Sequence, residues 1–190
     1  MTAGHCSPMA GIFFGRRLGK EPGPVDNPPK SKPGAIMAGR VDARLKQLKL
    51  ELPDAAAPLA NYVPFVRAGD LLFVSGQVCQ WNGERRFVGK LGAGISLEDG
   101  QQAARLCGLN LLAQARAAAG DLDRVRRCVR INGFVNSAPD FVQQPQVING
   151  CSDLFVDVLG DAGRHSRVAV GVASLPGDVA VEIDAVFEVG

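Results

Sequence analysis

The sequence predicts an α+β domain in which helices pack on one face of a single sheet. Along the chain, apolar and β-branched runs typical of strands alternate with longer helical segments, in the order two strands, helix, strand, helix, two strands. The chain has 190 residues, of which 46% are hydrophobic and 21% are charged, and this is enough for one sizeable core. Length and composition thus favour a single globular domain of this class.

The N-terminal segment differs from the rest of the chain. Residues 1–36 hold six of the twelve prolines, a density that is incompatible with regular structure. We expect a disordered, Pro/Gly-rich leader there and the folded domain over 37–190. Two origins of the leader stay open: a segment faintly like a transit peptide, and an upstream extension of a reading frame that starts naturally at Met37.

Charge and composition exclude several classes of function. The formal net charge of +2 comes mostly from the leader, because 37–190 hold 16 Lys and Arg against 17 Asp and Glu, which argues against a nucleic-acid partner. The two histidines and five widely spaced cysteines give no metal-site spacing, so we expect no metal and reduced thiols in the cytoplasm. No apolar stretch is long enough to predict a membrane span.

The first part of the expected domain holds a short helix and two strands. From Val41 the apolar residues recur at helical spacing, and Pro53 ends the helix that they predict. The run LLFVSGQV at 71–78 is rich in β-branched and apolar residues and predicts a strand. The polar loop CQWNGERR follows it, and Phe87 and Val88 mark a second candidate strand.

Two helices and a strand form the middle of the domain. Ser96 begins a long helix as its N-cap, and Gly120 ends it as a C-cap. The alternating run CVRINGFV at 128–135 predicts a strand. Pro145 then opens a second helix, which runs to Gly160.

The last two predicted strands, 167–174 and 179–189, are joined by the turn LPGD and carry the candidate chemistry. In the second strand, Glu182 alternates with an apolar set that packs on the helices. The valines from Val168 onward match that set, so Arg167 and Glu182 are predicted to project from the same side of the sheet. A guanidinium there can bind a carboxylate through two hydrogen bonds, beside a carboxylate that places water or moves a proton. The alternative is an ion pair between the two that closes a subunit contact.

This C-terminal run, R-V-A-V-G-V-A-S-L-P-G-D-V-A-V-E-I-D-A-V, resembles the signature of the Rid/YjgF family of reactive-intermediate imine deaminases, formerly called endoribonuclease-like. The resemblance covers about residues 55–189. It places Arg167 on the arginine that holds the substrate carboxylate in the family, and Glu182 on the catalytic glutamate.

Two upstream segments extend the resemblance. NYVPFVRAGDLLFVSGQV is similar to the N-terminal strands of the family and places Tyr62 on the pocket tyrosine, with Ser75 and Gly76 on the S-G step. VINGCSDLF places Asn149 on a family asparagine. The resemblance implies that these four residues bind substrate by shaping the pocket.

The resemblance also implies a fold, an assembly and a reaction. The fold is chorismate-mutase-like, with one mixed sheet and two helices on one face, and it assembles as a homotrimer with three clefts between subunits. The reaction is hydrolysis of 2-imino and 2-enamino acids, such as 2-aminoacrylate, to 2-keto acids and ammonia, without metal or organic cofactor. In it Arg167 holds the carboxylate, and Glu182 activates or places the water.

Two other functions are weighed beside this one. A non-catalytic module that binds a small carboxylate or a partner protein through the same cleft is the alternative. Endoribonuclease activity is less favoured, because the folded part is near neutral and holds one histidine, His165.

The chain departs from the family pattern at four places. Val168 and Ala169 stand where better-studied members have serine and cysteine, and the proline that usually precedes the arginine is missing from HSR. The segment between Phe141 and Asn149 is longer. The loop after the S-G-Q step is long and holds the only tryptophan, Trp81, for which a lid and a subunit contact are both open. A loop of this kind narrows the cleft or changes its ligand. The departures indicate a divergent branch of the family.

Overall fold

The computed structural model describes residues 39–56 and 61–190. The predicted leader over 1–36 lies outside these residues, so its disorder stays a prediction. In the described part, no helix combines the length and the apolar character that crossing a membrane requires.

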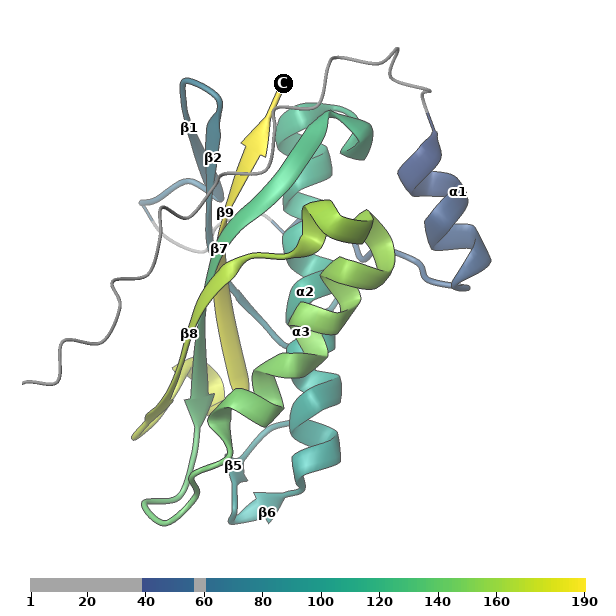
Figure 1. Ribbon diagram of the computed structural model, residues 1–190. Helices are drawn as coiled ribbons and strands as arrows, with labels where there is room; N and C mark the ends of the chain where they lie inside the picture. The colour runs from purple at the N-terminus through teal and green to yellow at the C-terminus, as the bar shows by residue number, and fades with distance from the viewer. Residues whose placement is uncertain (1–38, 57–60) are drawn as a thin grey trace, which may run out of the picture. The chain divides into compact units, whose positions relative to one another are not determined.

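A five-stranded mixed sheet forms the centre of the fold, in the order β1-β2-β9-β7-β8 (Figure 1). Neighbouring strands run antiparallel except β7 and β8, which run parallel. The predicted α+β class with one mixed sheet is therefore confirmed. The strands are β1 (Phe65–Ala68), β2 (Leu71–Val78), β7 (Val125–Asn136), β8 (Ser166–Val172) and β9 (Val181–Val189).

Helices α2 and α3 lie side by side on one face of the sheet, and α1 contacts α3 (Figure 1). We call the other face of the sheet the open face. The α-helices are α1 (Arg40–Gln47), α2 (Leu97–Ala119) and α3 (Gln144–Leu159). The remaining elements are β3 (Gln80–Trp81), β4 (Glu84–Arg85), β5 (Lys90–Leu91), β6 (Gly94–Ile95) and the 3-10 turns η1 (Leu122–Arg124), η2 (Gly160–Gly163) and η3 (Pro176–Asp178).

Local residues cap both ends of α2, whereas a carboxylate from a distant part of the chain caps the start of α1. Ser96 accepts a hydrogen bond from the Asp99 N–H, and Gly120 ends the helix, as predicted. At α1, the Asp123 carboxylate accepts hydrogen bonds from the N–H groups of Arg40 and Val41, at 2.8 and 3.0 Å. This second cap comes from far along the chain, so helical spacing alone does not reveal it.

The core lies between the sheet and the pair α2 and α3. Small residues let the two helices approach closely: a Cβ on Gly150 would overlap the carbonyl of Gln101, and one on Gly108 would lie 2.8 Å from Leu154. Close packing of this kind fixes the position of α3 over β8. On β9 the side chains that face the helices are fully or almost fully buried: Val181, Ile183, Ala185 and Phe187.

One strand prediction is wrong, and the sheet order separates the last two strands. Phe87 and Val88 form no strand, because Phe87 has a positive φ of 55° and Val88 makes only an isolated bridge to Val179. The polar loop before them folds instead into the hairpin β3–β4, turned by Asn82 and Gly83 with φ of 49° and 86°, the conformation that an Asn-Gly hairpin turn requires. The two last strands are also not neighbours, because β7 lies between them.

Candidate functional site

A small cavity lies on the open face beside the end of β2. Its volume is about 170 Å³, and its lining includes Tyr62, Gly76, Arg85, Pro176 and Glu182. We call this cavity the glutamate pocket. Three of the residues predicted from sequence, Tyr62, Gly76 and Glu182, therefore come together in one place.

A bulge in β2 brings the backbone of Gly76 against Glu182. The pairing of β2 with β9 shifts register between Val74 and Gln77, which leaves Gly76 outside the ladder. A Cβ on Gly76 would overlap Oε1 of Glu182. Glycine at this position therefore makes room for the carboxyl group of Glu182.

Ser75 supports the glutamate pocket from behind its lining. Its hydroxyl group donates a hydrogen bond to the Val63 carbonyl at 2.8 Å, and its N–H donates to the Pro64 carbonyl at 2.9 Å. These bonds hold the segment that carries Tyr62, whose side chain is 51% exposed. Ser75 therefore holds the backbone that directly follows Tyr62.

Glu182 is a half-buried carboxyl group with an unusual proton affinity. Burial raises its pKa above the usual value, and the nearby Asp184 carboxylate raises it further. Burial also raises the pKa of Asp184, while a hydrogen bond from Asn132 at 2.7 Å opposes that rise. A carboxyl group whose pKa is shifted toward neutrality exchanges protons more readily with a bound water or substrate.

Arg167 lies on the helix side of the sheet, not on the open face. Its Nη1 donates to Oγ of Ser152 at 3.0 Å, and its Nη2 donates to the Pro145 carbonyl at 3.1 Å, so both partners belong to α3. In the ladder Arg167 pairs with Ile131, which is fully buried among the core residues. The prediction that Arg167 and Glu182 project from the same side is therefore wrong.

The physical reason is the size of the side chains beneath α3. A Cβ on Gly171 would lie 2.6 Å from Oγ of Ser137 and 2.8 Å from Nε2 of Gln144, so a larger side chain at this position would displace these groups. Arg167, nearer the start of β8, has room to reach the groups of α3 that bind it. The valines of the strand point the other way instead, and Val168 and Val170 are 38% and 41% exposed. On this edge strand, the space under α3 determines which side chains face the helices. The valines therefore face away from the helices, although their hydrophobic pattern predicts the opposite.

Arg167 belongs to a hydrogen-bonded cluster with α3. The spacing of Asn149 and Ser152 along α3 places both on the helix face from which Ser152 binds Arg167. His165 Nδ1 lies 2.6 Å from the Gly163 carbonyl and so carries the proton. Its Nε2, 3.1 Å from Oγ of Ser152, then accepts the hydroxyl proton. We call Asn149, Ser152 and Arg167 the arginine cluster.

The sequence-based reasoning missed Ser152 and His165 as partners of Arg167. Burial lowers the pKa of His165; the hydrogen bond to the Gly163 carbonyl opposes this shift, and the Arg167 charge adds to it, so the net effect favours the neutral imidazole. A neutral His165 accepts from Ser152 and leaves the hydroxyl oxygen free to accept from Arg167. The signal that could have revealed this was the placement of Ser152 one helical turn after Asn149.

The predicted site residues thus form two separate groups in one chain. The glutamate pocket lies on the open face at β2 and β9, and the arginine cluster lies at β8 and α3 on the other side. Strand β7 separates β9 from β8. Within 39–56 and 61–190, no group of three or more His, Cys, Asp or Glu side chains is arranged to hold a metal ion.

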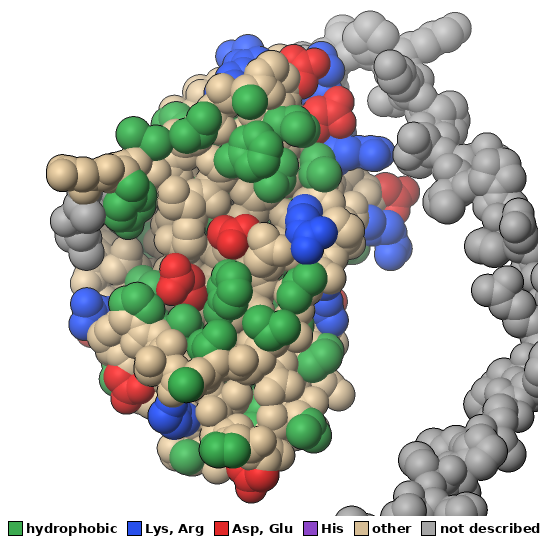
Figure 2. Space-filling view, turned by 90° about the vertical axis from the view of Figure 1, so that its left-hand side faces the viewer, with side chains coloured by type: hydrophobic (Ala, Val, Ile, Leu, Met, Phe, Trp, Pro, Cys, Tyr) green, Lys and Arg blue, Asp and Glu red, His purple; other side chains and the backbone are tan. Residues whose placement is uncertain are grey.

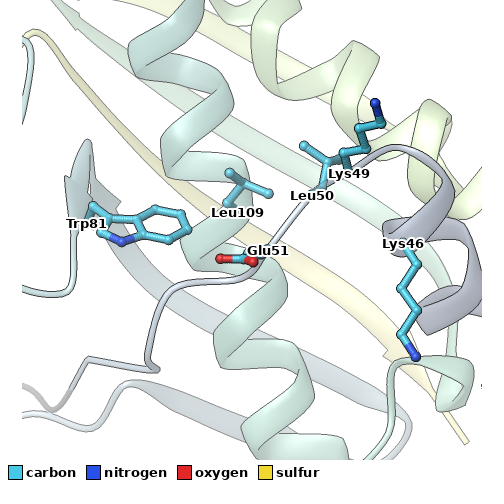
Figure 3. Close-up of a pocket in the computed structure, with 6 residues that line it drawn as sticks. All are labelled: Lys46, Lys49, Leu50, Glu51, Trp81 and Leu109. Carbon is cyan, nitrogen blue, oxygen red and sulfur yellow. The ribbon is translucent and has the colours of Figure 1, made fainter.

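Trp81 does not line the glutamate pocket. Figure 3 shows its indole ring directed toward Leu109 of α2, beside Leu50 and Glu51. These residues border an open hollow of about 540 Å³ that Lys49 also lines. The loop that carries Trp81 contributes a different residue, Arg85, to the glutamate pocket.

The open face exposes several large apolar side chains. Figure 2 shows hydrophobic side chains gathered on this face, with acidic side chains among them. Phe73 of β2 is 44% exposed, and it pairs with Val186 of β9 and Val66 of β1, which is 54% exposed. Large contiguous apolar patches on protein surfaces are often interaction sites.

Comparison with known proteins adds family and fold. The family model described as "YjgF/chorismate_mutase-like, putative endoribonuclease" matches residues 42–183. Protein TCP17 of Trypanosoma cruzi is 50% identical over 154 residues, which cover 80% of this chain and 96% of that protein.

Two similar crystal structures align over nearly their whole length. Protein Atu1372 of Agrobacterium tumefaciens, of unknown function, is 49% identical with a TM-score of 0.75, covering 80% of this chain and 93% of that chain. A putative endoribonuclease of Shewanella oneidensis is 34% identical with a TM-score of 0.76, covering 78% and 99%.

Two more distant crystal structures are those of TdcF and RidA. TdcF of E. coli, crystallised with bound serine, is 28% identical with a TM-score of 0.52, covering 73% of this chain and 94% of that chain. RidA of Psychrobacter is 25% identical with a TM-score of 0.52, covering 73% and 97%. The lower scores against these two place this chain on a divergent branch. The chain belongs to the YjgF/Rid family and has its chorismate-mutase-like fold.

Proposed function

We propose that this protein is a cofactor-independent deaminase that hydrolyses 2-imino and 2-enamino acids to 2-keto acids and ammonia. The observation that carries the proposal is the half-buried Glu182 carboxyl, which lines a small cavity against the backbone of Gly76. The serine bound in the related TdcF structure supports a small ligand that carries a carboxylate. The free cysteines of the described core fit a reducing compartment, so we place the protein in the cytoplasm.

The reaction requires the two groups of site residues to meet, and one chain holds them apart. We therefore propose a homotrimer in which the arginine cluster of one copy completes the glutamate pocket of the next. The exposed apolar residues of the open face supply a contact surface, and Arg167 lies on the edge strand β8, where a neighbouring copy can reach it. A head-to-tail contact of this kind closes into a ring of three identical sites.

The proposed mechanism begins with positioning. Arg167, oriented by Ser152 and the Pro145 carbonyl, binds the substrate carboxylate through parallel hydrogen bonds. Tyr62 and Asn149 border the substrate. Holding the imine carbon next to a water turns an encounter of separate molecules into a reaction within one complex, which lowers the barrier.

Proton transfer by Glu182 completes the reaction. An enamine first gains a proton from solvent at its terminal carbon and loses one from its nitrogen, which gives the imine. Glu182 then takes a proton from water as the water oxygen bonds to the imine carbon, and it passes this proton to the imine nitrogen to give the carbinolamine. Glu182 next takes the proton of the carbinolamine hydroxyl group and transfers it to the nitrogen, so that the C=O bond forms as the C–N bond breaks and ammonia and the keto acid are released.

The test is an assay with freshly generated 2-aminoacrylate. The native protein should release keto acid and ammonia faster than the uncatalysed reaction does. Arg167→Ala and Glu182→Gln should each remove the acceleration. Arg164→Ala is the matched control, because its side chain is exposed and only pairs with Asp161. No acceleration by native protein would contradict the proposal, and keto-acid binding without turnover would indicate a non-catalytic binding module instead.

A further inference from the structure

The hairpin β3–β4 brings a cation, Arg85, to the glutamate pocket. Arg85 lines this cavity together with Glu182 and Gly76. Among the described residues of the lining, it is the one with a positively charged side chain. The hairpin belongs to the long loop that departs from the family pattern, so the resemblance assigns no role to Arg85.

The hairpin is anchored on both sides, which fixes the position of Arg85. At its tip, Asn82 accepts a hydrogen bond from the Asp54 N–H at 2.9 Å. At its base, Asn110 of α2 donates to the carbonyl of Gln80 at 2.8 Å, and Gln80 is the ladder partner of Arg85. A side chain held on an anchored element loses less entropy when it binds a ligand.

The guanidinium of Arg85 rests on the turn η3. A Cβ on Gly177 would overlap this guanidinium, so the absence of a side chain there makes the space. No Asp or Glu in the described ranges lies within the 4.0 Å of a salt bridge to Arg85. The next residue contrasts with it, because Arg86 pairs with Glu84 at 3.1 Å. The charge of Arg85 is therefore available to a ligand.

The chemistry of this arrangement favours a small acidic ligand. A guanidinium binds a planar carboxylate through two parallel hydrogen bonds. The volume of about 170 Å³ lies below the roughly 300 to 1,000 Å³ of pockets for drug-sized ligands, so the ligand is a small metabolite. Arg85 and Glu182 line the same cavity without pairing, which leaves room between them for a bound molecule.

We propose that Arg85 makes the site selective for 2-imino acids with a second carboxylate on their side chain. The proposal rests on the proposed function, in which Arg167 of a neighbouring copy holds the carboxylate next to the imine. Arg85 then binds the side-chain carboxylate, and Glu182 stays available for water. A monocarboxylic substrate lacks the group that pairs with Arg85, so it binds without this second ion pair, and the difference in affinity gives the selectivity.

The test compares two keto acids by titration calorimetry. Native protein should bind the dicarboxylic 2-oxoglutarate roughly ten- to a hundredfold more tightly than the monocarboxylic 2-oxobutyrate, the range expected of one charge-assisted pair. Arg85→Gln should remove this preference while leaving 2-oxobutyrate binding within about threefold of native. Arg85→Lys should keep part of it. Arg86→Gln, one residue away and paired outside the pocket, should keep all of it.

Several results would overturn the inference: equal native affinities for the two keto acids, equal weakening of both by Arg85→Gln, or loss of the preference in Arg86→Gln. Thermal unfolding of each variant shows whether the fold is intact. Because binding needs no turnover, the inference is tested separately from the deaminase proposal. A preference that depends on Arg85 in a protein without turnover would support the selectivity and contradict only the catalysis. Turnover with equal kcat/KM for mono- and dicarboxylic imines would contradict only the selectivity.

Discussion

Gly76 and Glu182 face each other so closely that a methyl group on residue 76 would occupy the position of the Glu182 carboxyl oxygen. The contact crosses from β2 to β9 at a bulge, where the ladder between these strands shifts register. The bulge and the missing side chain together set where the carboxyl group lies. Gly76 thus contributes to the site through its backbone conformation and its lack of a side chain.

Gly76→Ala should therefore disturb Glu182 directly. We expect it to lower the free energy of unfolding by about 1 to 3 kcal/mol, because the added methyl group overpacks the contact. In a Glu182→Ala background the same substitution should cost less than about 0.5 kcal/mol, since the overlapping atom is gone. Chemical denaturation of the four proteins of this cycle measures both values. If Gly76→Ala lowers the free energy of unfolding equally in the two backgrounds, the contact with Glu182 is not the reason that residue 76 must be glycine.

The separation of Arg167 from Glu182 in one chain predicts complementation between inactive variants. Arg167→Ala and Glu182→Gln should each lack activity alone. After mixed assembly at equal amounts, random assortment should give about a quarter of the shared sites both native residues, and activity should return to roughly that fraction. The assay follows keto-acid release, and native mass spectrometry verifies that subunits have exchanged. Exchanged but inactive mixtures would contradict a site shared between copies.

The alternation of apolar and mostly polar residues on β9 was enough to predict that Glu182 lies on the face away from the helices. On β9 every second residue from Val181 is buried against α2 and α3, so period two identifies the two faces. The same rule failed on β8, where Val168 and Val170 face outward and Arg167 faces α3. A hydrophobic pattern predicts which residues are buried, but it does not predict whether a helix of the same chain or another copy of the chain covers them.

Other parts of the site depend on contacts between distant segments. The pattern of α2 predicts its ends, because Ser96 and Gly120 act locally. The bond from Ser152 to His165 joins α3 to the segment before β8. The seating of Arg85 on Gly177 likewise depends on how the hairpin folds back on η3. Such contacts follow only from the tertiary packing.

Glu182 should make folding stability depend on pH. Its pKa is raised in the folded chain, so the folded state keeps this proton where the unfolded state has lost it. The favourable contribution is complete below the unfolded pKa of about 4.3 and disappears as the pH rises through the folded pKa. Glu182→Gln keeps a neutral group at all pH values. Its stability relative to native should therefore increase from acidic to neutral pH.

Urea denaturation of both proteins between pH 4 and pH 8 measures this dependence. Glu98→Gln is the control, because Glu98 is exposed in the first turn of α2. A difference between native and Glu182→Gln that does not change with pH, or one that decreases toward neutral pH, would contradict a raised pKa for Glu182.

Ser152 should tune substrate binding through Arg167 without taking part in the chemistry. Ser152→Ala removes the acceptor 3.0 Å from Nη1 of Arg167 and the donor to His165, so the guanidinium loses one of its two restraints. One hydrogen bond of this kind is worth about 0.5 to 1.5 kcal/mol, which corresponds to a rise in KM of roughly two- to tenfold with kcat nearly unchanged. Ser152→Thr keeps the hydroxyl group and should restore KM. Ser166→Ala, which removes an exposed hydroxyl bond to the Val129 carbonyl, should leave both constants near native. A fall in kcat with KM unchanged in Ser152→Ala would show that Ser152 acts in the chemical step and not in orienting Arg167.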